Sequence, residues 1–241
     1  KMKIPYLESG YLNMAKIIEN PFPFCFVVGA RGTGKTFGAL DYVYERQYKH
    51  FILMRRTQEQ CNTISRQEFS PFKALEQYHH FDRLITCRSA GKNMGRYGDV
   101  IFDENGEEID YYTQGYSVAL STIANMRGFD MSDIELLIYD EFIKERHEKP
   151  MKDEGKAFLN AYETINRNRE LTGKSPVKCV CLANSNDIAN PLFIELGLVT
   201  TCERMLSKGI DVYTNKDRGI AVYLLHNSPI SQSKKNTALY K

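Results

Sequence analysis

The sequence predicts an α/β domain in which a mostly parallel sheet carries helices on both faces. An apolar run at residues 24–28 leads into a glycine-rich loop and then into a helical segment. Further apolar runs at 51–56, 134–142 and 177–184 are separated by polar or helical stretches. Strands that alternate with helices form parallel β-α-β units, and both faces of such a sheet are covered.

The first long helix is expected to begin near Gly34 and to end at about Tyr48. Residues 57–82 are polar, and we expect them to be helical in part. A β-hairpin is predicted at 99–112, because two alternating runs flank Asn105-Gly106, a pair that favours tight turns.

The second half of the chain continues the alternation of strands and helices. A strand is expected at 116–121, a helix at 154–169 and a last strand at 219–227. Four apolar residues of the helix recur at i, i+3, i+4 and i+7, which predicts one buried stripe. They are Phe158, Ala161, Tyr162 and Ile165. We therefore expect the main domain to span 1–227, with a polar linker or tail at 228–241.

Composition excludes few partners. The 241 residues are 42% hydrophobic and 26% charged, as in ordinary globular proteins. The sequence has no run of about 18 apolar residues, so no membrane span is predicted. The first residues do not have the pattern of a signal peptide. The net charge of +2 neither requires nor excludes nucleic acid. A DNA-binding surface would have to be local, for example in a pore shared by several subunits.

The six cysteines include no C-x-x-C pair. Cys179 and Cys181 alternate along a predicted strand, and we expect them to pack on one face rather than to bind a metal. Without an export signal, all six are interpreted as reduced thiols of a cytoplasmic protein. The tandem His79-His80 is interpreted as a surface feature.

The loop at 29–36 matches the phosphate-binding pattern G-x-x-x-x-G-K-[ST]. Its residues are Gly29, Ala30, Arg31, Gly32, Thr33, Gly34, Lys35 and Thr36. Glycines let backbone N–H groups point at phosphate oxygens, and the next helix adds its positive N-terminus. We expect Lys35 to reach the β- and γ-phosphates of ATP and Thr36 to bind Mg²⁺. The alternative is a glycine-rich turn with a surface lysine.

Two acids end the apolar run at 134–142. Asp140 is predicted to hold Mg²⁺, and Glu141 to orient and deprotonate an attacking water. Paired acids at a strand end are often merely solvated, but here they accompany the phosphate loop. A base poised for water favours hydrolysis over phosphoryl transfer to a metabolite.

Asn184 ends another apolar strand and could sense the γ-phosphate or the attacking water. Asn also favours turns, which is the alternative explanation. Ser185 and Asn186 are weaker candidates.

Arginines could act at three places. Arg167 and Arg169 lie near the end of the helix at 154–169, where they either complement the helix dipole or include a finger for a neighbouring subunit's ATP. Arg31 could be a solvated charge or could pair with Glu141 and hold that base away from water. Arg55-Arg56 could touch phosphate, a neighbour or DNA, or be surface residues.

The loop after Glu141 carries several basic residues. They are Lys144, Arg146, Lys149 and Lys152. A solvated loop of mixed charge is the simplest interpretation, and contact with DNA phosphates is the alternative.

Together these motifs resemble the DNA-packaging ATPases, or encapsidation proteins, of small tailed phages of the Salas type. The similar elements are "VVGARGTGKTF", "FILMRRTQE", "IYDEFIKE", "NRNRE" and "CLANSNDIANPLF". The resemblance covers residues of about 20 to 225, including the hairpin. It implies a RecA-like P-loop NTPase with an inserted β-hairpin, acting as a pentameric motor that drives double-stranded DNA into a preformed head.

The resemblance also implies cofactors, partners and site residues. ATP and Mg²⁺ are the cofactors, and the partners are other subunits of the ring, DNA and the portal of the procapsid, in the host cytoplasm. Whether a structural RNA joins the portal is left open. Lys35 and Thr36 match the phosphate-loop pair. Asp140 matches the Mg²⁺ acid and Glu141 the catalytic glutamate. Arg167 matches the arginine offered in trans and Arg31 the arginine thought to switch the glutamate.

Two features depart from the family pattern. Members usually continue into a nuclease-like domain, whereas this sequence stops at Lys241. A basic residue that members can carry two positions after the paired arginines is Gln58 here, which puts a DNA contact at this position in doubt.

Three other functions share some of these motifs. A small P-loop kinase is disfavoured by the tandem Asp140-Glu141, and a non-hydrolysing assembly protein by Glu141 itself. A ring ATPase that moves DNA in phage secretion or plasmid transfer would usually carry a membrane segment.

Overall fold

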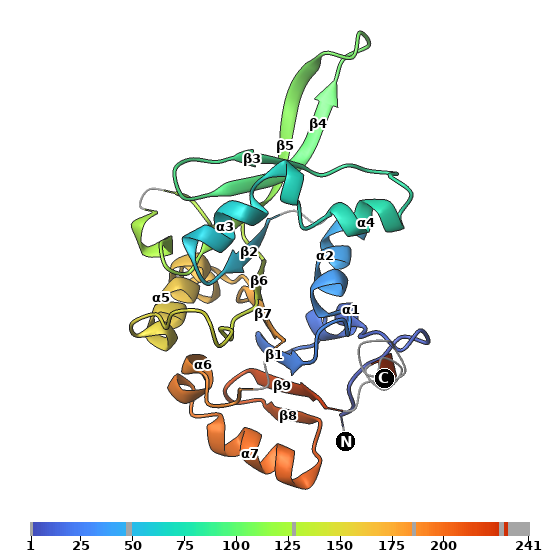
Figure 1. Cartoon of the computed structure of the whole chain (residues 1–241). Helices are drawn as coiled ribbons and strands as arrows, with labels where there is room; N and C mark the ends of the chain where they lie inside the picture. The colour runs from blue at the N-terminus through green and yellow to red at the C-terminus, as the bar shows by residue number, and fades with distance from the viewer. Residues whose placement is uncertain (1, 47–49, 127–128, 185–186, 227–228, 231–241) are drawn as a thin grey trace. The chain divides into compact units, whose positions relative to one another are not determined.

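A computed structural model describes most of the chain (Figure 1). The residues outside the description are 1, 47–49, 127–128, 185–186, 227–228 and 231–241. Most of the predicted tail at 228–241 is therefore not described, nor are Ser185 and Asn186.

The chain separates into two compact units, each described here by itself. Unit 1 comprises Lys1–Ala39, Asp140–Asn160 and Lys178–Lys241. Unit 2 comprises Leu40–Tyr139 and Ala161–Val177.

The sheet of unit 1 is built around one strand that is buried from its second residue onward. Strand β1 (Phe24–Gly29) runs parallel to β7 (Lys178–Ala183) on one side and to β9 (Ile220–Leu225) on the other, as Figure 1 shows. An edge strand, β8 (Val212–Asn215), is antiparallel to β9. The continuous apolar run of β1 is explained by this position, since both faces of a central parallel strand are buried.

Helices and a cluster of aromatic rings complete unit 1. Its short helices are α1 (Met14–Ile18) and α6 (Pro191–Glu195), followed by the longer α7 (Val199–Lys208). The rings of Phe26, Phe142 and Phe193 pack against one another with centroids 5.4–5.9 Å apart. This packing joins β1 to α6 and to the chain just after Asp140.

Unit 2 carries the predicted hairpin. Strands β4 (Gly95–Phe102) and β5 (Glu108–Ala119) are antiparallel and flank Asn105-Gly106, which confirms the prediction. The strand expected at 116–121 is the second half of β5, so one long strand replaces two short ones.

The remaining strands of unit 2 extend this pair on both sides. Strand β3 (Thr86–Ser89) pairs with β4 in antiparallel fashion. Strand β2 (Phe51–Arg55) is parallel to β5 and to β6 (Leu136–Asp140), whose last residue belongs to unit 1. Each unit thus combines three strands in parallel pairing with antiparallel strands on one side of them, which agrees with the predicted α/β class.

Helical segments of unit 2 fill the polar stretch at 57–82, as predicted. They are α3 (Gln58–Ile64), a 3₁₀ turn (Gln67–Phe69) and α4 (Lys73–Tyr78). Helix α3 begins with a capping box, in which the Thr57 hydroxyl accepts from the Gln60 N–H and the Gln60 side chain accepts from the Thr57 N–H. A second 3₁₀ turn covers Ile123–Asn125.

Two helices begin in one unit and end in the other. Helix α2 (Lys35–Glu45) begins as predicted but ends before the expected Tyr48. Helix α5 (Glu154–Asn166) ends before residue 169, because Arg167 and Asn168 have left-handed backbones with φ of 42° and 57°. A 3₁₀ turn (Arg169–Thr172) follows. All four residues of the predicted apolar stripe of α5 are buried.

One smaller prediction about the core is confirmed. Cys179 and Cys181 are buried with their sulfur atoms 3.6 Å apart, as expected for residues on one face of a strand. None of the described helices combines the length and the hydropathy that a membrane crossing requires.

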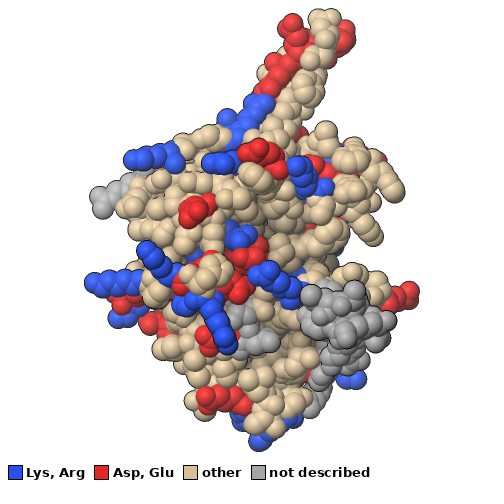
Figure 2. Space-filling model, viewed as in Figure 1, with Lys and Arg blue, Asp and Glu red and all other residues tan. Residues whose placement is uncertain are grey.

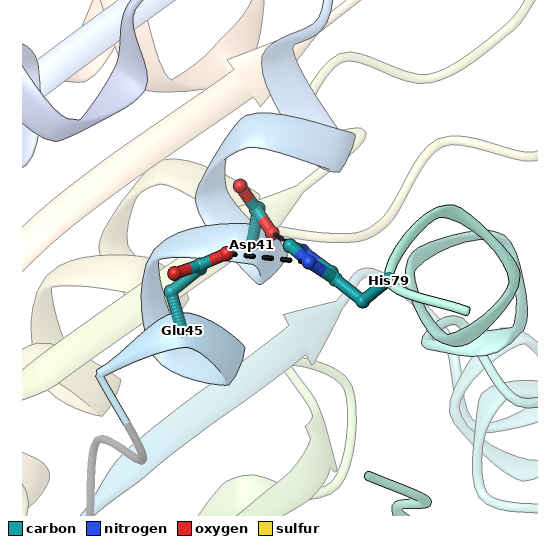
Figure 3. A group of neighbouring side chains, drawn as sticks. All are labelled: Asp41, Glu45 and His79. Carbon is teal, nitrogen blue, oxygen red and sulfur yellow. Dashed lines mark hydrogen bonds and ion pairs between the residues drawn. The ribbon is translucent and has the colours of Figure 1, made fainter. Parts of the chain in front are cut away.

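His79 lies in a latch that the sequence did not predict (Figure 3). Asp41 and Glu45 stand one turn apart on α2, and His79 follows α4. The Nε2 atom of His79 is 2.6 Å from an Asp41 carboxylate oxygen, and Nδ1 is 3.3 Å from one of Glu45. The imidazole also stacks on Tyr44 with ring centroids 5.0 Å apart. The tandem histidines therefore differ: His79 is a structural contact and His80 is exposed.

The latch predicts unequal effects for two neighbouring substitutions. His79→Ala should lower the free energy of unfolding by about 1–2 kcal/mol, because it removes the hydrogen bond with Asp41, the contact with Glu45 and the stacking on Tyr44. His80→Ala should change it by less than about 0.5 kcal/mol, as exposed substitutions usually do. Chemical denaturation of both variants measures the difference, and equal values would contradict the latch.

Candidate nucleotide site

The loop from Gly29 to Thr36 connects β1 to α2 within unit 1. Gly32 and Gly34 have φ of 72° and 90°, which only glycine adopts readily. A Cβ atom on Gly34 would also lie 3.3 Å from the Cβ atom of Tyr11. The sequence pattern therefore corresponds to a tightly wound loop, closed against the residues just before α1.

Lys35 lies inside this loop. The side chain is only 3% exposed, and its ammonium donates to the carbonyl oxygens of Gly29 (3.0 Å) and Ala30 (2.7 Å) and to the Thr33 hydroxyl (3.1 Å). Thr33 is itself fully buried. The alternative of a turn with a surface lysine is therefore wrong.

Thr36 and Asp140 meet beside Lys35. The Thr36 hydroxyl donates to an Asp140 carboxylate oxygen at 2.8 Å, and Asp140 is buried. A hydroxyl and a carboxylate are hard oxygen ligands, which Mg²⁺ prefers. Two residues separated by more than a hundred positions thus form a donor set that fits this ion.

Glu141 follows with an unusual backbone. Its φ is 53°, a left-handed value that costs a non-glycine residue about 1–3 kcal/mol. The next residue is held firmly, because the Phe142 N–H donates to the Leu182 carbonyl of β7 at 3.1 Å and its ring is buried. The conformation of Glu141 is therefore imposed by its neighbours, and its side chain is half-buried.

Asn184 lies at the same end of the sheet as the loop. The parallel register pairs Val28 with Ala183, so Gly29 and Asn184 follow at the same level on β1 and β7. The side chain of Asn184 is half-buried. The loop, Asp140-Glu141 and Asn184 are thus brought to one end of unit 1, as the sequence indicated.

Arg31 pairs with an acid that sequence reasoning missed. Its guanidinium donates to the Glu145 carboxylate at 2.8 Å, and the arginine side chain remains largely exposed. This hydrogen bond and the charge of Glu145 raise the pKa of Arg31, and the charge of Glu141 adds a smaller contribution. Arg31 therefore feels both carboxylates, with Glu145 the stronger influence.

Glu145 is positioned by a turn of its own. Its backbone N–H donates to the Glu148 carboxylate at 2.6 Å, and the Glu148 N–H donates back to the Glu145 carbonyl at 3.1 Å. Nothing in the sequence marks this acid among the mixed charges of the loop, because its role depends on a turn.

Arg167 and Arg169 have different surroundings in unit 2. Arg169 donates to the carbonyl oxygens of Ser175, Ser132 and Ile134, so it ties three segments together. Arg167 is 44% exposed and donates to the Phe129 carbonyl at 2.9 Å.

Arg167 falls within the helix predicted at 154–169, but the helix has already ended at that point. Its N–H caps the helix on the Glu163 carbonyl. The left-handed turn, not a continued helix, presents its side chain.

The residues after β2 also differ from expectation. Arg56 is fully buried and Arg55 partly so, which excludes a surface role for Arg56. Gln58 donates to Asn62 at 2.7 Å and accepts from Thr122. The Gln58 side chain is thus occupied within its own chain, which argues against a DNA contact at this position.

Basic and acidic residues are interleaved on the face of the molecule in Figure 2. The basic residues of 144–152 are exposed or half-exposed and alternate with Glu145 and Glu148.

Among the described residues, Asp41, Glu45 and His79 also bring three ligand-type atoms within 4.8 Å of one another. At 2.6 Å, the contact of His79 with Asp41 leaves no room for an ion between them, which fits the latch better than a metal site.

A family model described as Podovirus DNA encapsidation protein (Gp16) matches residues 7–239. The chain belongs to this family. It is 27% identical over 196 residues to the DNA packaging protein of Bacillus phage phi29, covering 80% of this chain and 52% of that one. It is 30% identical over 178 residues to the DNA packaging protein of Bacillus phage B103, covering 72% and 48%. The chain thus spans about half the length of these relatives.

Solved structures match the fold. The N-terminal domain of the DNA packaging ATPase from bacteriophage phi29 aligns with a TM-score of 0.66 at 24% identity, covering 90% of this chain and 99% of that domain. The Phi-28 gp11 DNA packaging motor aligns with a TM-score of 0.63 at 20% identity, covering 95% and 66%. These matches confirm the predicted fold class, and the family match confirms the resemblance.

The site predicts the effect of removing its buried cation. Lys35→Ala should lower ATP affinity about 100-fold or more, because the loop loses the charge that reaches the β- and γ-phosphates. Lys208→Ala is the matched control, since that lysine is exposed in the last turn of α7. Equilibrium binding of a fluorescent ATP analogue measures both. A Lys35→Ala protein that is folded by circular dichroism and binds like the wild type would remove Lys35 from the site.

Proposed function

We propose that this chain binds ATP with Mg²⁺, hydrolyses it, and acts within a ring at the portal to drive double-stranded DNA into a preformed phage head. The hydrogen bond of Thr36 with Asp140, beside the buried Lys35, is the observation that carries the proposal. Membership of the encapsidation family supports the role in packaging.

Nucleotide binding would begin at the loop. Its N–H groups and the N-terminus of α2 would surround the phosphates, and Lys35 would exchange its contacts with loop oxygens for phosphate oxygens. Thr36 and Asp140 would hold Mg²⁺. The bound ion would neutralise negative charge that develops on the phosphates.

Hydrolysis would depend on Glu141. Its carboxylate is proposed to accept a proton from the attacking water, while Asn184, at the same end of the sheet, contacts the γ-phosphate or that water. Arg31, shared electrostatically by Glu145 and Glu141, is proposed to modulate the base.

The partners follow from the family rather than from this site. Relatives are named DNA packaging proteins, and solved structures of similar fold are entitled packaging motors. We propose that subunits of this chain form the ring, that DNA and the procapsid portal are its partners in the host cytoplasm, and that residues 1–227 form the ATPase part. The small P-loop kinase weighed above finds no support in this family.

Phosphate release without any acceptor is the first test of the proposed reaction. Wild-type protein should release phosphate from ATP with Mg²⁺, whereas Glu141→Gln should bind ATP with unchanged affinity and turn over at least about 100-fold more slowly. The amide of glutamine cannot accept the proton. Near wild-type turnover in Glu141→Gln would remove Glu141 from the mechanism.

Arg167 should act across the subunit boundary, and mixing tests this. Arginine fingers contribute about 10³–10⁵ in rate, so Arg167→Ala should bind ATP but hydrolyse it very slowly. Mixed with Glu141→Gln, it should regain activity at interfaces where an intact finger meets an intact site. Arg169→Ala is the control for lost packing: it keeps both Glu141 and Arg167, so it should lower stability through its lost contacts in unit 2 without blocking hydrolysis in the folded protein. If co-assembled Arg167→Ala and Glu141→Gln recover no activity at any ratio, the action in trans is wrong.

A further inference from the structure

The outer part of the β4–β5 hairpin stands as a two-stranded ribbon. Residues 95–98 of β4 pair with β3, and residues 115–119 of β5 pair with β2. Beyond these, the described strand pairing joins only 98–102 with 108–113 (Figure 1). A ribbon of two strands in water has little stability of its own, so its composition is informative.

Apolar side chains are exposed along this ribbon. They are Ile101 (42%), Phe102 (60%), Ile109 (63%) and Tyr112 (39%). Single exposed apolar residues are ordinary, but a group of four on a narrow ribbon is typical of a surface that a partner covers.

The tip is also acidic. Residues 99–112 include six acids and no Lys or Arg, and red atoms mark the tip in Figure 2. Asp99, nearer the base of the hairpin, is paired with Arg83, and Glu108, which lies opposite Phe102 at the outer end, is paired with Arg88. The other four acids are Asp103, Glu104, Glu107 and Asp110. Their negative charges would repel phosphate groups, so DNA does not fit this surface.

The hairpin is pre-organised for docking. One carboxylate oxygen of Asp103 accepts from the N–H groups of Asn105 and Glu107, both at 2.9 Å, which fixes the turn. Arg88 donates to both Glu108 oxygens at 2.6 Å and lies over the Tyr111 ring. A rigid element loses little conformational entropy when it binds.

We propose that the hairpin tip docks onto a second copy of this chain, at the segment 144–152. Four basic residues of that segment complement the acids of the tip, and its Pro150 and Met151 offer apolar contact to Phe102 and Ile109. The two acids of the segment already have partners, Glu145 in Arg31 and Glu148 in the Glu145 N–H. This inference rests on the proposed function, in which several copies of this chain form a ring.

A charge swap tests the docking. Glu104 and Glu107 are exposed, and their side chains take no part in the hydrogen bonds that Asp103 makes. The double variant E104K/E107K should weaken self-association at least about tenfold at low salt, measured by sedimentation velocity, because like charges then face each other. K149E/K152E should do the same, and mixing the two variants should restore association between them. The matched control is E203K/D217K, two exposed acids of unit 1.

A photo-crosslink locates the contact directly. p-Benzoylphenylalanine at position 102 should form a crosslink to a peptide containing 144–152 of another copy, identified by mass spectrometry. A crosslink to any other segment, or unchanged association of E104K/E107K, would overturn the docking.

The outcomes separate the docking from the proposed function. In one outcome, the wild type and E104K/E107K hydrolyse ATP and self-associate to the same extent. That result would leave the ATPase proposal intact and exclude only the hairpin contact. Wild-type protein that stays monomeric at every concentration would contradict the docking, while phosphate release would still report on the reaction.

Discussion

The ammonium group of Lys35 is the contact on which the geometry of the site depends. It satisfies three oxygen atoms of the loop that surrounds it, including the carbonyls of Gly29 and Ala30. Without a cation there, the buried oxygens of Gly29 and Thr33 would lose a donor, which is costly. The loop is therefore wound around the same charge that is proposed to bind the phosphates. The ammonium group of Lys35 thus stabilises the loop and is also the proposed phosphate contact.

The strand before the loop makes this arrangement rigid. A Cβ atom on Gly29 would lie 2.5 Å from the Cβ atom of Leu225, so β1 and β9 approach too closely for any larger residue. Sheet pairing on both sides of β1 then fixes where the loop begins, and the Phe142 N–H bonded to Leu182 fixes where the acids begin. The strand pairing and the Phe142–Leu182 hydrogen bond together place Thr36 beside Asp140. The hydrogen bond between these two side chains does not have to hold them there by itself.

Much of this could be predicted from the sequence, because continuous apolar runs and glycine patterns report strongly on buried parallel strands and phosphate loops. The end of α5 could not, since Arg167 and Asn168 carry no helix-breaking signal and their left-handed turn depends on contacts such as Arg167 with Phe129. Strand β3 also escaped prediction, because its residues Thr86–Ser89 form no apolar run and only Cys87 among them is buried. The partners of Arg31 and His79 depend on turns and neighbouring helices, which local sequence does not encode.

Glu141 and Arg167, the residues proposed to act on the nucleotide from two subunits, share an unfavourable backbone. Both have positive φ without being glycine, and each directly follows a regular element, β6 in one case and α5 in the other. In a strand or a helix, the regular backbone sets the direction of each side chain. A left-handed residue just after such an element breaks that regularity, so its side chain points in a direction that the element itself would not allow. Strain of this kind persists only where the surroundings enforce it, and it concentrates at functional sites. Other described residues without a proposed role share this backbone, namely His50, His80, Phe81, Asp153 and Asn168. The left-handed turn therefore explains how Glu141 and Arg167 present their side chains, and their roles rest on the proposed experiments.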